Sequence, residues 1–295
     1  MKRILAVCMA WVSLFVLPAA VLADGKEQHG AKDKHHDELA EPIFTKRSFP
    51  EKEIELEVAF DNKADEDELE IGIGASWVFF NRLQLGVEIP FEIRDPEEGD
   101  TESDLGDVEF SGKYMLHRAP ENRFLLSFDV EIAPPTGDED KEIGQKGEWG
   151  LFLTAGSSVP MDWLVPGGRV PDLGAHLQFG YSQQMRLTDE ERGEAEELGV
   201  AAVHEKELIW NLAFNAKLFD GILIPEFEVL GRTVVDAIER KEKGTFVELA
   251  GGLWLAPFKE DSPLGGFRLG VAAKAPVTNK KERFVSTLFI LKWEF

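Results

Sequence analysis

The chain closes with the stretch Phe289-Ile290-Leu291-Lys292-Trp293-Glu294-Phe295, and this stretch decides the fold. Counting back from Phe295, every second residue is apolar, whereas the residues between them include Glu294 and Lys292. A period of two with one apolar face is typical of a β-strand that separates an apolar phase from a more polar one. The end of the chain is therefore predicted to be such a strand.

The aromatic end of that strand carries a further indication. Phe295, with Trp293 two residues before it, resembles the C-terminal assembly signal of bacterial outer-membrane β-barrels. The resemblance implies a protein of the bacterial outer membrane. Its partners would be the membrane lipid around the wall and the barrel-assembly machinery, which would bind Trp293 and Phe295.

The same alternation recurs from residue 51 onward. The apolar-polar segments are 54–60, 71–79, 83–91, 108–116, 124–132, 148–159, 173–181, 210–218, 223–229, 247–255, 267–271 and 289–295. They predict about twelve strands, and short connections alternate with long acidic ones, as in bacterial outer-membrane barrels. Because an open sheet edge in lipid leaves backbone groups unpaired, residues 51–295 are expected to form a closed antiparallel transmembrane β-barrel.

A water-soluble β-sandwich or a lipocalin-like barrel would show the same alternation. Three features favour the membrane barrel: the N-terminal secretion signal, the terminal Phe295 and the difference in loop length. The interpretation requires that the rings of Phe128, Trp210, Phe214 and Trp293 face the acyl chains.

The first residues have the organisation of a secretory signal peptide. Lys2 and Arg3 form the positive start, residues 4–16 form the apolar run, and residues 21–23 form a cleavage site of the small-residue type. We therefore expect residues 1–23 to be removed. A retained membrane anchor is the alternative, but the apolar run is short for a spanning helix.

Residues 24–50 are polar and show no period, so we expect a flexible periplasmic leader. Its histidines His29, His35 and His36 are candidate ligands for Zn, Ni or Cu. Their spacing matches no structural metal-site pattern, and an unstructured polar tail is the alternative.

The composition narrows the range of partners. The formal net charge is −23, and it becomes −25 once Lys2 and Arg3 leave with the signal peptide. Such acidity argues against nucleic acid as a partner. The acidic runs lie in the predicted connections, where they form either solvated loops or a mouth that attracts cations. Cys8 is the only cysteine and lies in the signal peptide, which excludes disulfides and Cys-bound metal from the mature chain.

Two short stretches are similar to a known family. Asp104-Leu105-Gly106-Asp107-Val108 leads into Lys113-Tyr114, and Ala133-Pro134-Pro135-Thr136-Gly137-Asp138 closes the next strand. Together they resemble the outer-membrane barrel family named for the meta-pathway of phenol degradation. The resemblance implies a transport-like barrel for small organic, often aromatic, compounds. The residues also have a local explanation, because Gly106 permits a sharp turn and residues 135–137 end a strand.

If the apolar faces meet lipid, the polar faces line the lumen. Our candidate lumen-lining residues carry charges or amides on those faces: Glu88, Glu92, Glu109, Lys113, Asp129, Glu131, His176, Gln178, Asn211, Asn215, Lys217, Glu226, Glu228, Glu248, Arg268 and Lys292. Such residues either brace the barrel by pairing across it or select ions at a constriction.

No pattern of a catalytic site appears. The histidines of the barrel are scattered, and none has a serine one or two residues away on the same face, as a serine hydrolase would favour. We expect no enzyme activity and no cofactor. The sequence predicts a channel or transporter for passive passage of small solutes, with aromatic or other small organic compounds as one class. The alternative is a plugged structural or docking barrel, whose acidic loops or His-containing leader bind a partner or a metal.

Overall fold

The computed structural model describes residues 42–62, 66–96, 101–119, 123–137, 143, 147–159, 173–185, 204–219, 221–236, 244–258, 262, 264–278 and 285–295. The regular elements of this part are all β-strands: β1 (Glu53–Asn62), β2 (Glu66–Phe79), β3 (Leu83–Pro96), β4 (Glu102–Leu105), β5 (Glu109–Arg118), β6 (Leu125–Ala133), β7 (Glu148–Val159), β8 (Leu173–Gln184), β9 (Lys206–Ala216), β10 (Leu223–Asp236), β11 (Gly244–Leu255), β12 (Phe267–Pro276) and β13 (Val285–Glu294). Across these residues, no helix has the length and apolar character needed to cross a membrane.

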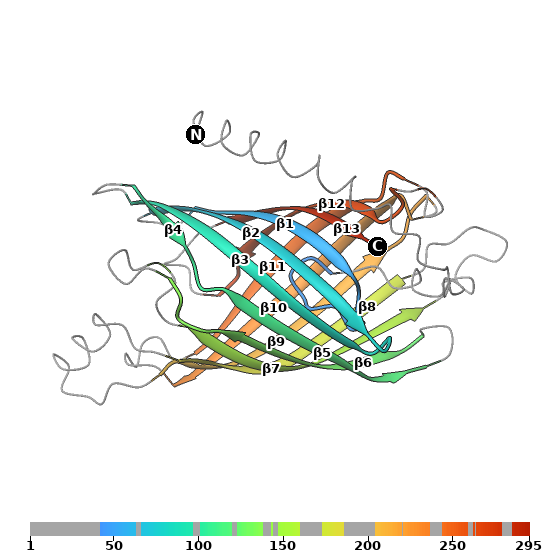
Figure 1. The fold of residues 1–295 in the computed structure, drawn as a ribbon, viewed down its shortest axis with the longest axis horizontal. Helices are drawn as coiled ribbons and strands as arrows, with labels where there is room; N and C mark the ends of the chain where they lie inside the picture. Colours follow the sequence, from blue (N-terminus) through green and yellow to red (C-terminus); the bar gives the residue numbers. More distant parts are fainter. Residues whose placement is uncertain are drawn as a thin grey trace. The chain divides into compact units, whose positions relative to one another are not determined.

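The strands form one closed antiparallel sheet. Apart from β4, each strand pairs with the strands before and after it, with β3 next to β5, and β1 pairs with the last strand, β13, from Glu53 opposite Glu294 to Asn62 opposite Val285. The ring contains twelve strands, because the short strand β4 pairs with β3 alone, outside the ring. The predicted closed barrel of about twelve strands is confirmed, and its tilted strands are seen in Figure 1. The sequence did not predict β4, which lies in a segment expected to be a loop.

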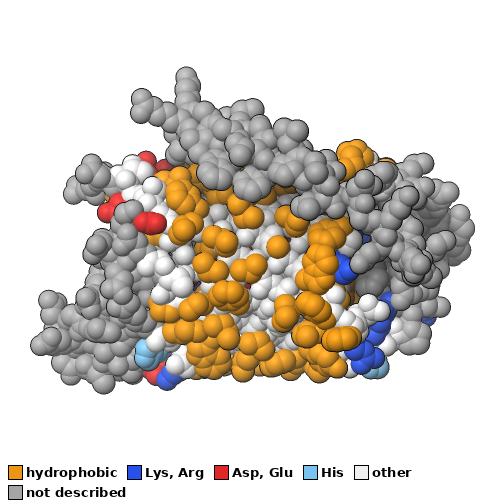
Figure 2. Space-filling model, viewed as in Figure 1, with side chains coloured by type: hydrophobic (Ala, Val, Ile, Leu, Met, Phe, Trp, Pro, Cys, Tyr) orange, Lys and Arg blue, Asp and Glu red, His pale blue; other side chains and the backbone are white. Residues whose placement is uncertain are grey.

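The two faces of the sheet differ as the alternation predicts. Phe110, Phe128, Phe214 and Phe289 have exposed side chains, and the residues on either side of each are less exposed. Hydrophobic side chains gather across the middle of the face in Figure 2, and the charged and histidine side chains lie toward its two ends. An apolar band between polar ends is the outer surface of a barrel that sits in lipid.

Tight turns close the hairpins on one side of the barrel. Phe80 and Asn81, between β2 and β3, have φ values of 53° and 55°. Two successive residues with positive φ are typical of a type I′ hairpin turn, whose twist matches the strands it joins.

Residues 42–52 lie inside the barrel, and we call them the inner segment. Their partners belong to β3, β5, β6, β8, β10 and β13, which are distributed around the ring and can be reached together only from within. The inner segment is drawn in blue behind the front strands in Figure 1. The chain therefore packs against the barrel from residue 42, within the stretch expected to be a flexible leader. Residues 1–41, with His29, His35, His36 and the expected signal peptide, lie outside the described residues.

Candidate functional site

The barrel wall holds the backbone of the inner segment through one buried carboxylate. Glu228 on β10 is fully buried and accepts hydrogen bonds from three consecutive backbone N–H groups. The N–H groups of Ile43 and Phe44 donate to its Oε1 at 3.0 and 2.7 Å, and that of Thr45 donates to its Oε2 at 2.6 Å. Hydrogen bonds to an ionised acceptor are stronger than neutral ones. Glu228 is therefore a strong attachment point for the inner segment.

Further wall residues bind the inner segment through its backbone, and one of them is Glu226 on β10, which accepts from the N–H of Ile43 at 2.8 Å. Gln178 on β8 accepts from the N–H of residue 46 at 3.1 Å, and Gln84 on β3 accepts from that of residue 51 at 3.0 Å. The Lys113 ammonium donates to the carbonyl of residue 47 at 2.5 Å, and the Ser127 hydroxyl donates to that of residue 48 at 2.5 Å. Backbone groups that lack strand partners thus find partners in the wall, as buried peptide groups require.

A buried ion cluster joins the inner segment to the last strand. The ammonium of Lys292 on β13 lies 3.2 Å from Glu51, 2.9 Å from Glu53 and 3.1 Å from Glu294. The guanidinium of Arg47 binds Glu51 and Glu53 as well, at 2.6 Å each. Glu294 also lies 3.1 Å from Arg268, so three cations compensate three carboxylates in the interior. Buried charges are tolerated only with such pairing.

A second group of ions lies on the early strands. Lys46 of the inner segment forms an ion pair with Glu131. Lys113 lies 3.1 Å from Asp129, and the hydroxyl of Thr154 donates to Asp129 at 2.9 Å. These interactions join the inner segment to β6, and β6 to its neighbours β5 and β7.

Part of the interior is apolar. Ile224, Trp254, Leu288 and Ile290 form a buried cluster on β10, β11 and β13, and Ile43 and Phe44 of the inner segment pack against it. The sequence analysis assigned only polar residues to the inner face. It missed this apolar part, because apolar residues that alternate with an equally apolar outer face leave no polar-apolar period. The signal that points to it is the apolar pair Ile43 and Phe44, which follows a polar stretch.

One cavity lies between the inner segment and the acidic side of the wall. It measures about 250 Å³ and extends over β1, β2, β3, β5 and β6. Glu55, Glu88 and Glu109 line it together with small residues such as Gly74 and Ser76. The cations that line it, Lys46, Arg47 and Lys113, are fewer than its carboxylates, which also include Glu53, Asp129 and Glu131. Small side chains on the strands leave room beside the carboxylates, so this side of the interior combines free volume with negative charge.

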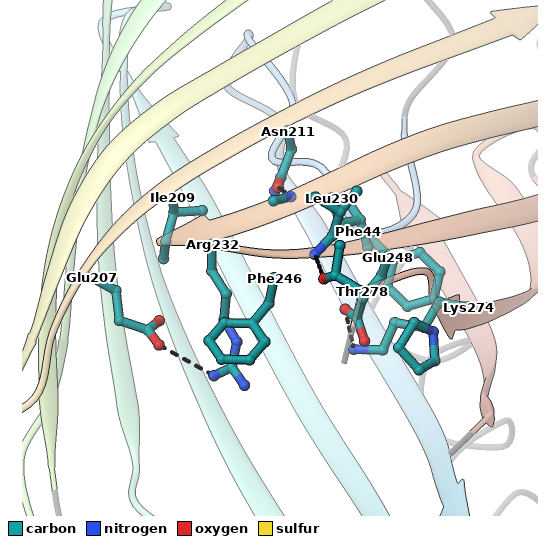
Figure 3. A pocket seen from close by; sticks show the side chains of 13 residues that line it. Phe44, Glu207, Ile209, Asn211, Leu230, Arg232, Phe246, Glu248, Lys274 and Thr278 are labelled. Carbon is teal, nitrogen blue, oxygen red and sulfur yellow. Dashed lines mark hydrogen bonds and ion pairs between the residues drawn. The ribbon is translucent and has the colours of Figure 1, made fainter. Parts of the chain in front are cut away.

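A second cavity, also about 250 Å³, lies against β9 to β12 and is shown in Figure 3. Phe44 and Phe246 contribute aromatic rings to it. The Lys274 ammonium lies 5.5 Å from the centre of the Phe44 ring, and the Arg232 guanidinium lies 5.2 Å from that of Phe246. Each cation also faces an acid, because Arg232 lies 3.2 Å from Glu207 and Lys274 lies 3.8 Å from Glu248. The cavity is amphipathic, with rings and paired charges.

The candidate lumen-lining residues fall into two groups by exposure. The buried ones are Asp129, His176, Gln178, Asn211, Asn215, Glu226, Glu228 and Lys292. The half-buried ones are Glu88, Glu92, Glu109, Lys113, Glu131, Lys217, Glu248 and Arg268. Many of them meet in pairs, such as Asn211 with Gln178 at 2.9 Å and Arg268 with Glu294 at 3.1 Å. The described residues contain no group of three potential ligands able to hold a metal ion.

Several residues of the interior were not among the candidates. Lys46, Arg47 and Glu53 belong to the inner segment or to its junction with β1, where the sequence shows no strand period. Gln84 and Ser127 lie on strand faces that the alternation does mark as polar.

Comparison with known proteins places the fold. No protein-family model matches the chain, and no curated protein does. Among solved structures, an outer-membrane channel from Pseudomonas putida F1 is similar at a TM-score of 0.55 with 10% identity, covering 92% of this chain and 100% of that one. The NanC porin is similar at a TM-score of 0.52 with 9% identity, covering 82% of this chain and 100% of the porin. At these identities the likeness establishes the fold, an outer-membrane type of β-barrel.

Proposed function

We propose that the protein is an outer-membrane channel for the passive passage of small solutes. The observation that carries the proposal is a closed barrel with an apolar outer band around an interior of charged and amide side chains that contains two cavities. A polar interior inside an apolar wall is what a solute path across lipid requires. The two similar structures are themselves a porin and a channel, which supports the proposal. The proposed passive passage of solutes requires no catalysis.

The acidic cavity favours cations among those solutes. Glu88 and Glu109 line this cavity from β3 and β5, and no Lys or Arg of the described residues forms an ion pair with them. Rings and rows of carboxylates select cations in pores. We therefore propose that small cations and polar solutes pass more readily than anions.

The amphipathic cavity supports a second class of solute. The rings of Phe44 and Phe246 and the cations beside them offer stacking and cation–π contacts to a small aromatic molecule. The resemblance of residues 104–114 and 133–138 to the family named for phenol degradation implies the same class. Small aromatic compounds are thus the organic solutes that we propose for this barrel.

The channel proposal is tested with the purified full-length protein in lipid vesicles and planar bilayers. We expect vesicles that contain the protein to swell in isosmotic solutions of small sugars, amino acids or phenols, and bilayers to show single-channel steps. Protein-free vesicles and a heat-denatured sample are the controls. If neither uptake nor current appears for any solute, the proposal is wrong.

The inner segment gives a specific reason to consider a plugged barrel as the second candidate, because it is bound to the wall by many contacts. In that case the acidic loops or the histidines at positions 29, 35 and 36 would bind a partner or a metal, and bilayers would show no current. We further propose that residues 1–23 direct export and that Trp293 and Phe295 engage the assembly machinery. Phe295 has an exposed side chain that an assembly factor can reach.

A further inference from the structure

We infer that the inner segment is a gate, which closes the lumen in the position described here and leaves it when the channel opens. This inference rests on the proposed channel function and adds to it a moving part. The gate consists of residues 42–50, and the link to β1 at residues 51 and 52 is its hinge.

The first observation is that the inner segment crosses the lumen. The side chain of Ile43 lies against β11, since its Cδ1 is 2.5 Å from where a Cβ on Gly252 would lie. Four residues later, the carbonyl of Arg47 accepts a hydrogen bond from Lys113 on β5. In the ring of twelve strands, β5 and β11 are six places apart and therefore face each other. A chain that contacts both stands in the path of a solute.

The second observation is that the inner segment is held without being part of the sheet. No residue between 42 and 52 belongs to a strand. The C-terminal end of the segment continues directly into β1. Its attachments are side-chain bonds to its backbone, from residues such as Glu228, Gln178 and Lys113, and ion pairs from its own side chains, such as Lys46 with Glu131. Because these bonds are separate from the backbone ladder of the barrel, the segment can be released without breaking any strand pair. In a water-filled lumen both sides of each bond are rehydrated on release.

The third observation identifies the latch. Glu228 binds three consecutive N–H groups, at residues 43 to 45, which form the end of the described segment farthest from the hinge; Glu226 shares the first of them, at 2.8 Å. Ile43 and Phe44 add an apolar contact at the same place. Release of this end frees the remainder to swing toward the mouth where β1 begins. Glu228 is thus the residue whose loss should favour the open state most.

A reversible crosslink tests the gate directly. A Cβ on Gly156 of β7 would lie 3.2 Å from the Cβ of Ser48, a few tenths of an ångström below the range of about 3.5–4.5 Å found in disulfides. In the double variant Ser48→Cys/Gly156→Cys the two introduced thiols can therefore form a bond, and Cys8 is the only native cysteine. Its formation is verified by mass spectrometry of a proteolytic digest before recording.

The expected result is a loss of most of the bilayer current in the oxidised variant and its return when a reductant is added. The two single-cysteine variants should show no response to the reductant. Equal currents in the verified oxidised and reduced states would overturn the gate. A variant that lacks residues 42–49 separates the two proposals. If it too passes no current, the channel proposal fails; if it conducts while the crosslink has no effect, only the gate fails.

The latch is tested by Glu228→Gln, which keeps the size of the side chain but replaces one acceptor oxygen with a donor NH₂ group. We expect a higher open probability and a larger mean current than in the unmodified protein. The matched control is Glu102→Gln, which removes an equal charge from the short strand β4, outside the ring of strands and away from both cavities. If both variants change the open probability equally, Glu228 is not the latch.

Discussion

The side chains of Asp107 and Thr136 each accept a hydrogen bond from a backbone N–H group of the other residue's loop. The backbone N–H of Thr136 donates to Asp107 Oδ1 at 2.7 Å, and the Thr136 hydroxyl accepts from the N–H of Val108, the residue after Asp107, at 2.9 Å. Asp107 also accepts from the N–H groups of Gly137 at 3.0 Å and Gly147 at 2.9 Å. The two stretches that carry the family resemblance thus form one clasp between β5, β6 and β7, which explains their residues by local structure.

The clasp gives the first prediction. Asp107→Ala leaves three backbone N–H groups without their acceptor, so we expect the free energy of unfolding to fall by about 2–3 kcal/mol, since hydrogen bonds to charged groups contribute about 1.5–3 kcal/mol each and water replaces part of the loss. The measurement is urea-induced unfolding in detergent micelles. Asp107→Asn keeps one acceptor oxygen, so its free energy of unfolding should lie between those of the unmodified protein and Asp107→Ala. Equal stability of all three proteins would contradict the role of the clasp.

The buried ion cluster gives the second prediction. Lys292→Met removes the cation that faces Glu51, Glu53 and Glu294 and leaves carboxylates buried with less compensation. Breaking a buried pair costs about 3–5 kcal/mol, and we expect a loss of stability in that range. Lys292→Met combined with Glu53→Gln should recover part of the loss. The measurement is thermal unfolding, followed by the shift of the folded band on gels of unheated samples. If the losses of stability from Lys292→Met and Glu53→Gln simply add in the double variant, the two residues are not coupled.

Crowding at Gly156 gives the third prediction. The methyl group of Gly156→Ala would press on the side chain of Ser48, whose Cβ lies 3.2 Å away, and so should disfavour the seated inner segment. We expect a larger mean bilayer current. Gly251→Ala is the matched control, because a Cβ there has no neighbour within 4 Å. Adding Ser48→Gly to Gly156→Ala removes the crowding against the inner segment and leaves only the contact with His176, so it should restore most of the original current. If the current does not return, the effect arises at His176 and not at the inner segment.

The acidic cavity gives the fourth prediction. Glu88→Gln with Glu109→Gln should lower the cation-to-anion permeability ratio by about twofold, because unit charges several ångströms apart in water interact by about 0.5 kcal/mol. Reversal potentials across a bilayer with a KCl gradient measure the ratio. Glu102→Gln, on the short strand β4 outside the ring, is the control for a change in total charge. An unchanged ratio in the double variant would show that selectivity arises at another place.

The outer wall could be predicted from the sequence far better than the interior. Alternation marks residues such as Phe128 and Phe214 as outward-facing because lipid demands apolar side chains at every second position. The interior imposes no such rule, so Trp254 and Ile290 are buried there beside Glu228. The inner segment escaped prediction for a related reason. It is held mostly through its backbone, which every residue possesses, so its own side chains need follow no pattern.

The pairing of β1 with β13 has a consequence for how the molecule is made. The wall is complete only when the last-synthesised strand reaches the first one, and Lys292 brings to that final strand the charge that meets Glu51 next to β1. Pairing of β1 with β13 and binding of the inner segment inside the barrel are therefore coupled. If the barrel closed before the inner segment had entered it, Lys292 would be buried without the charge of Glu51. This cost favours enclosure of residues 42–52 while the first and last strands pair.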